Sequence, residues 1–106
     1  MITFNDFKKL DLRIGKILSA EKVQGTDKLM KLDIDLGTEK RQLVAGIADM
    51  YEPETLIGKE IPVLTNLEAR KIKGIESQGM ILAVDVAGKP ILLYPEREVP
   101  PGSTMR

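Results

Sequence analysis

The strongest constraint on the fold is the segment 31–36, KLDIDL, in which charged and apolar side chains alternate. The apolar members are Leu32, Ile34 and Leu36. Such alternation is the pattern of a β-strand that buries one face and exposes the other. A strand of this kind needs an apolar layer beneath it, so the segment predicts a small β-sandwich or barrel.

Other short apolar segments, separated by turn residues, predict further strands. The expected strands, besides 31–36, are 12–18, 41–45, 61–64, 80–86 and 91–94. The first should bulge or bend near Gly15, and tight turns are expected at 37–40 and at Gly88–Lys89. A helical turn is expected at 53–57, and the proline-rich residues after Pro95 should be extended. A helical turn between the third and fourth strands fits the all-β, five-stranded Greek-key barrel called the OB-fold.

The N-terminus is expected to form one short helix. Thr3 can cap this helix, and Asp6, three residues later, suits the positive end of the helix dipole. Phe4, Phe7 and Leu10 recur at helical spacing and form an apolar stripe. Because so short a helix is not stable alone, the stripe should pack on the core of the domain or on a second subunit.

Composition limits the classes of function. The 106 residues are enough for one domain, 1–106, and the chain is formally neutral, with 16 Lys and Arg against 16 Asp and Glu. Because Cys and His are both absent, we expect no catalytic residues, no metal site and no cofactor. The start, MITFNDFKK, lacks the apolar run of a signal peptide, and no segment approaches the roughly 20 apolar residues of a membrane helix. A cytoplasmic protein without membrane contact is therefore expected.

A local basic cluster interrupts this neutrality in residues 66–82, NLEARKIKGIESQGMIL. Its glycines would let the backbone of a flexible loop approach a phosphate chain, which Arg and Lys side chains can bind. Met80 could contact a sugar or base, or simply begin the core of the next strand. A merely solvated loop is the alternative for the whole cluster. The candidate RNA-binding residues of this segment are Asn66, Arg70, Lys71, Lys73, Ser77, Gln78 and Met80.

Two further cations stand at predicted connections between strands. Lys28 lies between the first two strands, where loops border the binding face of an OB-fold, although it could be an ordinary surface lysine. Arg41 either faces the same groove or pairs with Asp33 or Asp35 across the sheet. Aromatic residues are few, with two Phe and two Tyr. This scarcity argues against base stacking on single strands and favours reading the shape and backbone of a folded RNA.

Several blocks of the chain resemble a known family. It is the tRNA-binding domain found in methionyl-tRNA synthetases, in proteins of the endothelial-monocyte-activating-polypeptide type and in free-standing dimeric tRNA-binding proteins. The resemblance runs nearly end to end. It is carried by residues 11–17 (DLRIGKI), 27–29 (DKL), 32–37 (LDIDLG), 44–47 (VAGI), 66–67, 70–71, 74, 77–83 (SQGMILA) and 101–102 (PG).

The resemblance implies an OB-fold that binds tRNA by its L-shape and has no catalytic activity of its own. It also implies a homodimer built from both termini, with Phe4, Phe7 and Leu10 at the interface. The chain would be either free-standing or a C-terminal domain or accessory subunit of a methionyl-tRNA synthetase. Lys28, Arg41 and the candidates of residues 66–82 would then form the RNA site. One departure from the family pattern is Glu68, whose negative charge predicts weaker RNA binding.

Two alternatives stand beside this hypothesis. An export-type chaperone that binds unfolded peptide would need an exposed apolar groove rather than a basic one. A module that only dimerises would carry a basic loop that is merely solvated.

Overall fold

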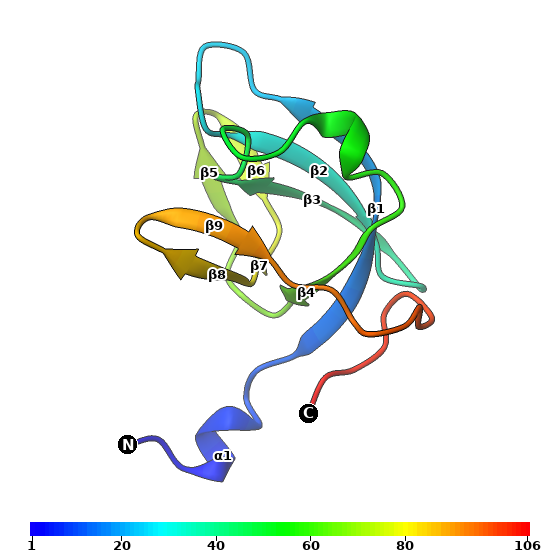
Figure 1. Ribbon diagram of the computed structural model, residues 1–106. Helices are drawn as coiled ribbons and strands as arrows, with labels where there is room; N and C mark the ends of the chain where they lie inside the picture. The colour runs from blue at the N-terminus through cyan, green and yellow to red at the C-terminus, as the bar shows by residue number, and fades with distance from the viewer.

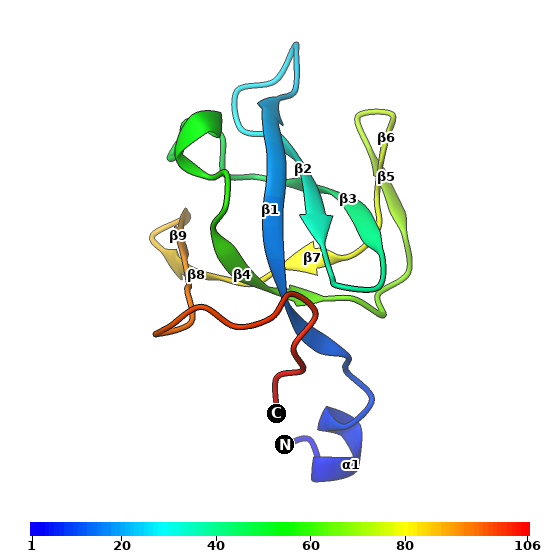
Figure 2. The same cartoon turned by 90° about the vertical axis from the view of Figure 1, so that its right-hand side faces the viewer.

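Five antiparallel strands form a nearly closed barrel in the computed structural model, which describes all residues 1–106 (Figures 1 and 2). They lie in the order β3-β2-β1-β4-β7. Their bounds are β1 (Leu12–Lys22), β2 (Met30–Asp35), β3 (Lys40–Ala45), β4 (Glu60–Leu64) and β7 (Met80–Ile81). A helix α1 (Phe4–Phe7) precedes the barrel, and a 3-10 turn η1 (Pro53–Thr55) lies between β3 and β4. The predicted OB-type architecture is confirmed.

Strand β1 is the longest element and is shared by two neighbours. Its first part, residues 12–16, pairs with β4, and residues 16–22 pair with β2. The expected irregularity is present, but it falls between Ile17 and Ser19 rather than at Gly15. A glycine is required at position 15 for a different reason. A Cβ atom there would lie 2.3 Å from Cγ2 of Ile34, so only glycine lets β1 cross this closely over β2.

The barrel interior is filled by the apolar face that the alternation predicts. Leu32 and Ile34 of β2 are fully buried, and the charged residues that alternate with them are only half-buried. Every residue of β4 is buried. The core cluster consists of Ile17, Met30, Leu32, Ile34, Leu36, Leu43, Ala45, Ile47, Ala48, Leu56, Ile61, Val63 and Leu92.

Two small hairpins lie outside the five-stranded sheet and overturn two expectations. Residues 70–77 are not a flexible loop, because they form β5 (Arg70–Ile72) and β6 (Ile75–Ser77). Residues 80–86 are not one buried strand, because the chain leaves the barrel at Leu82 and continues into β8 (Ala83–Val86), which pairs with β9 (Lys89–Leu92). All four residues of β8 are exposed. Composition alone suggested burial there, but no other layer covers either face of this strand, so its side chains remain in solvent.

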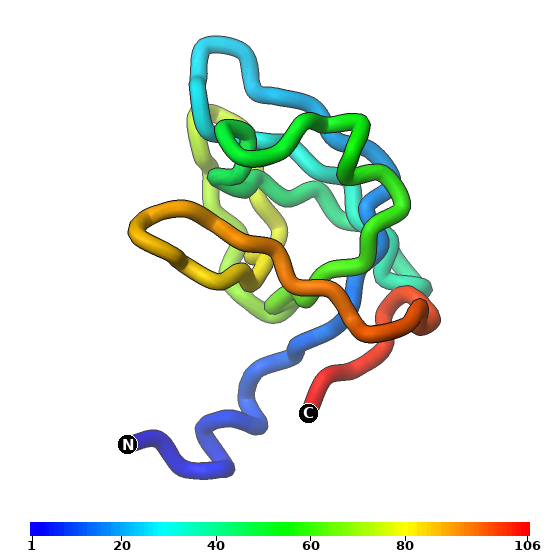
Figure 3. Tube along the Cα trace, in the orientation of Figure 1, coloured from blue at the N-terminus to red at the C-terminus, as the bar shows by residue number.

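The C-terminal tail runs beside the start of β1 and is not helical, as expected. The amide of Ile14 donates to the carbonyl of Ser103 at 2.9 Å, and the amide of Gly102 donates back to the carbonyl of Ile14 at 2.7 Å. Both chain ends therefore lie on the same side of the barrel (Figure 3). No helix here has the length and apolarity that crossing a membrane requires.

Candidate nucleic-acid interface

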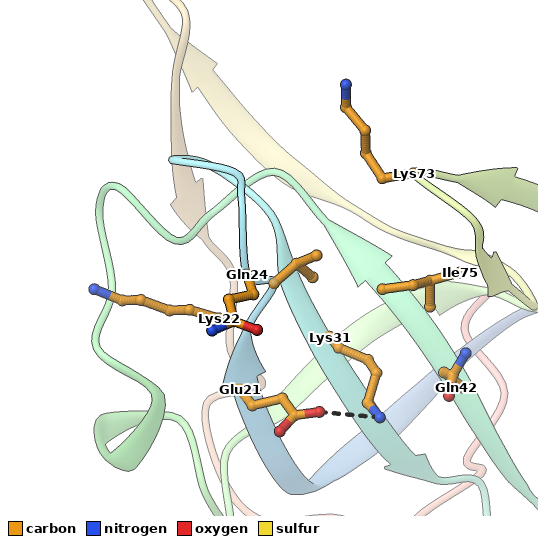
Figure 4. A pocket seen from close by; sticks show the side chains of 8 residues that line it. Glu21, Lys22, Gln24, Lys31, Gln42, Lys73 and Ile75 are labelled. Carbon is orange, nitrogen blue, oxygen red and sulfur yellow. Dashed lines mark ion pairs between the residues drawn. The ribbon is translucent and has the colours of Figure 1, made fainter.

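A groove opens between the β1–β2 connection and the β5–β6 hairpin (Figure 4). Its volume is about 670 Å³. Residues from β2 and β3 lie between its two walls. Three lysines and one glutamate line it, so the groove is basic although the whole chain is neutral. The lining residues are Glu21, Lys22, Val23, Gln24, Lys31, Gln42, Lys73 and Ile75.

A second hollow adjoins the groove and shares Lys73 with it. This hollow, of about 440 Å³, is lined by Thr26, Asp27, Lys28, Leu29, Ile72 and Lys73. Lys28 and Lys73 are therefore on opposite walls of one hollow, although 44 residues separate them in the chain. Two of the predicted cations are brought together in this way.

The β5–β6 hairpin fixes the position of Lys73. Its two turn residues, Lys73 and Gly74, have φ values of 52° and 79°, as a two-residue hairpin turn that follows the strand twist requires. Arg70 lies on the same face of the hairpin as Ile72 and Ile75, which line the two hollows. Lys71 lies on the other face, opposite Glu76. We refer to Lys28, Arg70 and Lys73 as the rim cations, and none of them has a carboxylate partner.

Ser77 and Gln78 hold the hairpin against the barrel. Ser77 is 1% exposed, and its hydroxyl accepts from the amide of Val44 and donates to the carbonyl of Gly79, both at 3.0 Å. The side-chain oxygen of Gln78 accepts from the amide of Gln42 at 3.1 Å, and the amide of Gln78 donates to the carbonyl of Gln42 at 2.9 Å. The single hydroxyl hydrogen of Ser77 is therefore already used inside the fold.

Arg41 lies outside the groove and has a partner that neither expectation named. Its Nε donates to Glu39 at 2.5 Å, and its guanidinium also donates to the carbonyls of Thr65 and Gln78. This guanidinium lowers the pKa of the Glu39 carboxyl below its usual value. Arg41 thus joins β3 to the chain on both sides of the β5–β6 hairpin.

Asn66 and Met80 also lie apart from the groove lining. The side chain of Asn66 accepts from the amide of Asp11 at 2.8 Å and donates to the carbonyl of Lys9 at 2.6 Å. It therefore ties the N-terminal arm to the barrel. Met80 begins β7 and is 39% exposed, so it is not a buried core residue.

The predicted site residues missed five polar residues of the groove, which are Glu21, Lys22, Gln24, Lys31 and Gln42. Lys31 belongs to the outer face of the alternating strand, a position that the sequence pattern assigns only to solvent. Its ammonium pairs with Glu21 at 3.0 Å, and this hydrogen bond raises the pKa of Lys31. The signal that could have found it is the register of β1 against β2, which places Lys31 directly opposite Glu21.

The predicted interface residues Phe4, Phe7 and Leu10 lie together at the chain ends. They line an apolar hollow of about 340 Å³ with the C-terminal residues 104–106. Phe4 is 72% exposed and Leu10 is 45% exposed. The helix itself carries the predicted cap, since the Thr3 hydroxyl accepts from the amide of Asp6 and the Asp6 carboxylate accepts from the amide of Thr3.

Relatives of known sequence match this chain closely. A methionine–tRNA ligase from Methanothrix thermoacetophila is 54% identical over 106 residues, which are 100% of this chain and 16% of that protein. The chain thus spans about one sixth of the length of this curated relative.

Solved structures share the fold over the whole chain. The MetRS-related protein from Pyrococcus horikoshii superposes with a TM-score of 0.95 at 38% identity, with 100% of this chain and 98% of that chain covered. The chaperone CsaA from Bacillus anthracis superposes with a TM-score of 0.92 at 36% identity, with 100% and 99% covered. Residues 12–104 match the family described as "Putative tRNA binding domain". The chain therefore belongs to this tRNA-binding domain family, as the sequence blocks indicated.

Proposed function

We propose that this chain is a binding module that recognises folded tRNA by the positions of its phosphates and not by its base sequence. The observation that carries the proposal is that Lys28 and Lys73 lie on opposite walls of one hollow beside the groove, without carboxylate partners. Arg70, also without such a partner, lies on the same face of the β5–β6 hairpin as the lining residues Ile72 and Ile75. Phosphates supply the counter-charge that these cations lack. The module has no catalytic role of its own.

Each rim cation suits phosphate in its own way. Arg70 offers a planar guanidinium that can bind two phosphate oxygens, whereas Lys28 and Lys73 act as compact charges on flexible stems. Lys71, on the outer face of the hairpin, adds to the positive field. We assign a contact with sugar or base to Met80. Arg41, Ser77 and Gln78 are assigned to holding the β5–β6 hairpin in place, because their side chains are bonded within the fold. Asn66 is assigned to holding the N-terminal residues against the barrel.

The absence of aromatic rings from the groove lining favours recognition of shape. Proteins that bind single strands without sequence preference stack bases on such rings. A hairpin held by several hydrogen bonds presents its cations at fixed spacing, and a folded RNA presents its phosphates at fixed spacing. Two preorganised partners lose less conformational entropy on binding than a flexible RNA would.

We further propose that the module serves a methionyl-tRNA synthetase, either as its C-terminal domain or as an accessory subunit, and raises the affinity of that enzyme for tRNA in the cytoplasm. The support is the 54% identity with one part of a methionine–tRNA ligase. A homodimer through the apolar hollow of Phe4, Phe7 and Leu10 fits the exposure of these side chains.

The test is a direct titration of the protein with folded tRNA and with an unstructured RNA of equal length, each at low and at moderate salt. Tighter binding of folded tRNA, which weakens as salt rises, is the expected result. Equal affinity for both RNAs would reduce the groove to a general basic patch. No binding of either RNA at low salt would contradict the proposal.

A second candidate is the binding of unfolded peptide, because one hairpin exposes an apolar face. Val84, Val86 and Ile91 lie on the same side of the β8–β9 hairpin and are 44%, 53% and 40% exposed. The structural similarity to a chaperone is consistent with such a role. Competition between tRNA and an unfolded polypeptide tests whether the two bind at different surfaces. A polypeptide bound at β8–β9 would leave tRNA binding in the groove unchanged.

A further inference from the structure

An ion pair lies inside the groove, between its two walls. Lys31 of β2 and Glu21 of β1 face each other in the β1–β2 ladder, and Nζ of Lys31 lies 3.0 Å from Oε1 of Glu21 (Figure 4). The Lys31 side chain is 31% exposed and that of Glu21 is 67% exposed. Both charged groups are therefore within reach of a ligand that enters the groove.

Lys31 differs from the rim cations in having a carboxylate partner from its own chain. Across the groove, Lys73 has no such partner. Lys22, the third lysine of the lining, pairs at 3.2 Å with Glu52, and Glu52 lies outside the lining. Glu21 is therefore the only acidic side chain in the lining of the groove.

We propose that Lys31 is a further phosphate-binding residue of the groove and that Glu21 is a built-in competitor that RNA must displace from it. This inference rests on the proposed function, because it assigns residues to the same groove. Glu21 lowers the affinity of the groove for any phosphate chain.

The physical basis is an exchange of one anion for another on the same ammonium. An ion pair between partly exposed side chains contributes little, so a phosphate can replace it at small cost. The Lys31 ammonium has three donors on a flexible stem and can turn from the carboxylate to the ligand. Until it turns, the carboxylate both occupies the ammonium and repels the incoming phosphate. An affinity held down in this way allows a carrier module to release its RNA.

The direct test is the variant Glu21→Gln, which keeps the shape of the side chain and removes its charge. We expect tRNA affinity at low salt to rise about three- to fivefold, the equivalent of one exposed ion pair. Lys31→Ala should weaken binding and make the slope of log K against log salt shallower by about 0.9, the value for one phosphate contact of a duplex. Thermal unfolding of both variants checks that the barrel is intact.

The double variant makes the inference specific. If Glu21 acts by competing for Lys31, then Glu21→Gln should give no gain when Lys31 is already alanine. Glu96→Gln is the matched control, because it removes the same charge and breaks an ion pair with Arg97 of 2.8 Å outside the groove. Its affinity for tRNA should equal that of the wild type.

Each outcome decides something different. The same gain from Glu21→Gln with and without Lys31 would overturn the competitor role, since Glu21 would then act only through its general field. If the wild type bound tRNA and Glu21→Gln bound it with the same affinity, this inference would be overturned and the proposed function would stand. If the wild type bound no tRNA at low salt, the proposed function would fail and this inference with it.

Discussion

The β5–β6 and β8–β9 hairpins are built alike and present opposite surfaces. Each turns through two residues of positive φ, Lys73–Gly74 in one and Ala87–Gly88 in the other, and each lies outside the five-stranded sheet. Figure 2 shows them on either side of the barrel. One places Lys73 and Ile75 in the wall of a polar groove, and the other exposes an apolar face.

The two hairpins also differ in how they are attached. The β5–β6 hairpin is bonded to β3 through Ser77, Gln78 and Gln42. The β8–β9 hairpin buries Leu92 in the core, and the amide of Leu92 donates to the hydroxyl of Tyr51 at 3.1 Å. Side-chain hydrogen bonds thus position the β5–β6 hairpin. The β8–β9 hairpin is positioned by the buried side chain of Leu92 and by the hydrogen bond of its amide. Turn geometry decides that a hairpin forms, and its side chains decide what it can bind.

The largest expected effect comes from removing the rim cations together. The triple variant Lys28→Ala, Arg70→Ala, Lys73→Ala should weaken tRNA binding about a hundredfold, because three phosphate contacts of about 1 kcal/mol each are lost. The slope of log K against log salt should become shallower by about 2.7. Titration at several salt concentrations measures both quantities.

A charge-matched control sharpens this result. The triple variant Lys59→Ala, Lys89→Ala, Arg97→Ala removes the same charge from the part of the molecule that includes the β8–β9 hairpin. Its tRNA affinity should stay close to that of the wild type. Equal losses in the two triple variants would show that the location of the charge does not matter.

The attachments of the two hairpins should differ in their effect on stability. Ser77→Ala leaves the buried amide of Val44 without an acceptor and should lower the free energy of unfolding by about 1–3 kcal/mol. It should also weaken tRNA binding, because the β5–β6 hairpin loses a hydrogen bond to β3. Tyr51→Phe removes the acceptor of the Leu92 amide and should cost about 0.5–1.5 kcal/mol without weakening tRNA binding. Denaturant unfolding and titration measure these effects, and weaker tRNA binding by Tyr51→Phe would break the proposed division of roles.

The apolar hairpin should tolerate polar substitution. Val84→Thr, Val86→Thr and Ile91→Thr change exposed side chains but keep their β-branched shape, so each should alter the free energy of unfolding by no more than about 0.5 kcal/mol. Binding of tRNA should be unchanged. Loss of binding to an unfolded polypeptide in the combined variant would support the second candidate function, and an effect on tRNA affinity would contradict the separation of the two surfaces.

The smallest expected effect is a pH dependence of the free energy of unfolding. It comes from the ion pair between Arg41 and Glu39. The pKa of Glu39 is lowered from 4.5 in the folded state, so the pair stabilises the fold above that pH. Its contribution is lost as pH falls through the lowered pKa. When the pH falls below about 4.5, the free energy of unfolding should therefore decrease slightly more for the wild type than for Glu39→Gln. Parallel curves for the two proteins would rule out this contribution.

The sequence predicted the parts of the fold that depend on local pattern. The alternation of Leu32 and Ile34 located β2, and the capping residue Thr3 located the start of α1. It could not predict that Ser77 bonds to Val44, because these residues are 33 positions apart and meet only when the barrel closes. The pairing of Lys31 with Glu21 was hidden for the same reason, since it depends on a strand register that includes the irregularity after Ile17.

The candidate site was predicted in outline. The basic cluster and Lys28 were found as charges, and the barrel brings Lys28 and Lys73 to one hollow. The exposure of β8 could not be inferred, because an apolar strand gives no sign of whether another layer will cover it.

If tRNA binds between the β1–β2 connection and the β5–β6 hairpin, the amide chemical shifts of the ¹⁵N-labelled protein should change there during titration with tRNA. We predict shifts concentrated in residues 21–31, 40–45 and 70–80, with little change in residues 83–92. Shifts concentrated in the β8–β9 hairpin, with those of Lys28, Lys31 and Lys73 unchanged, would contradict the assignment of the groove.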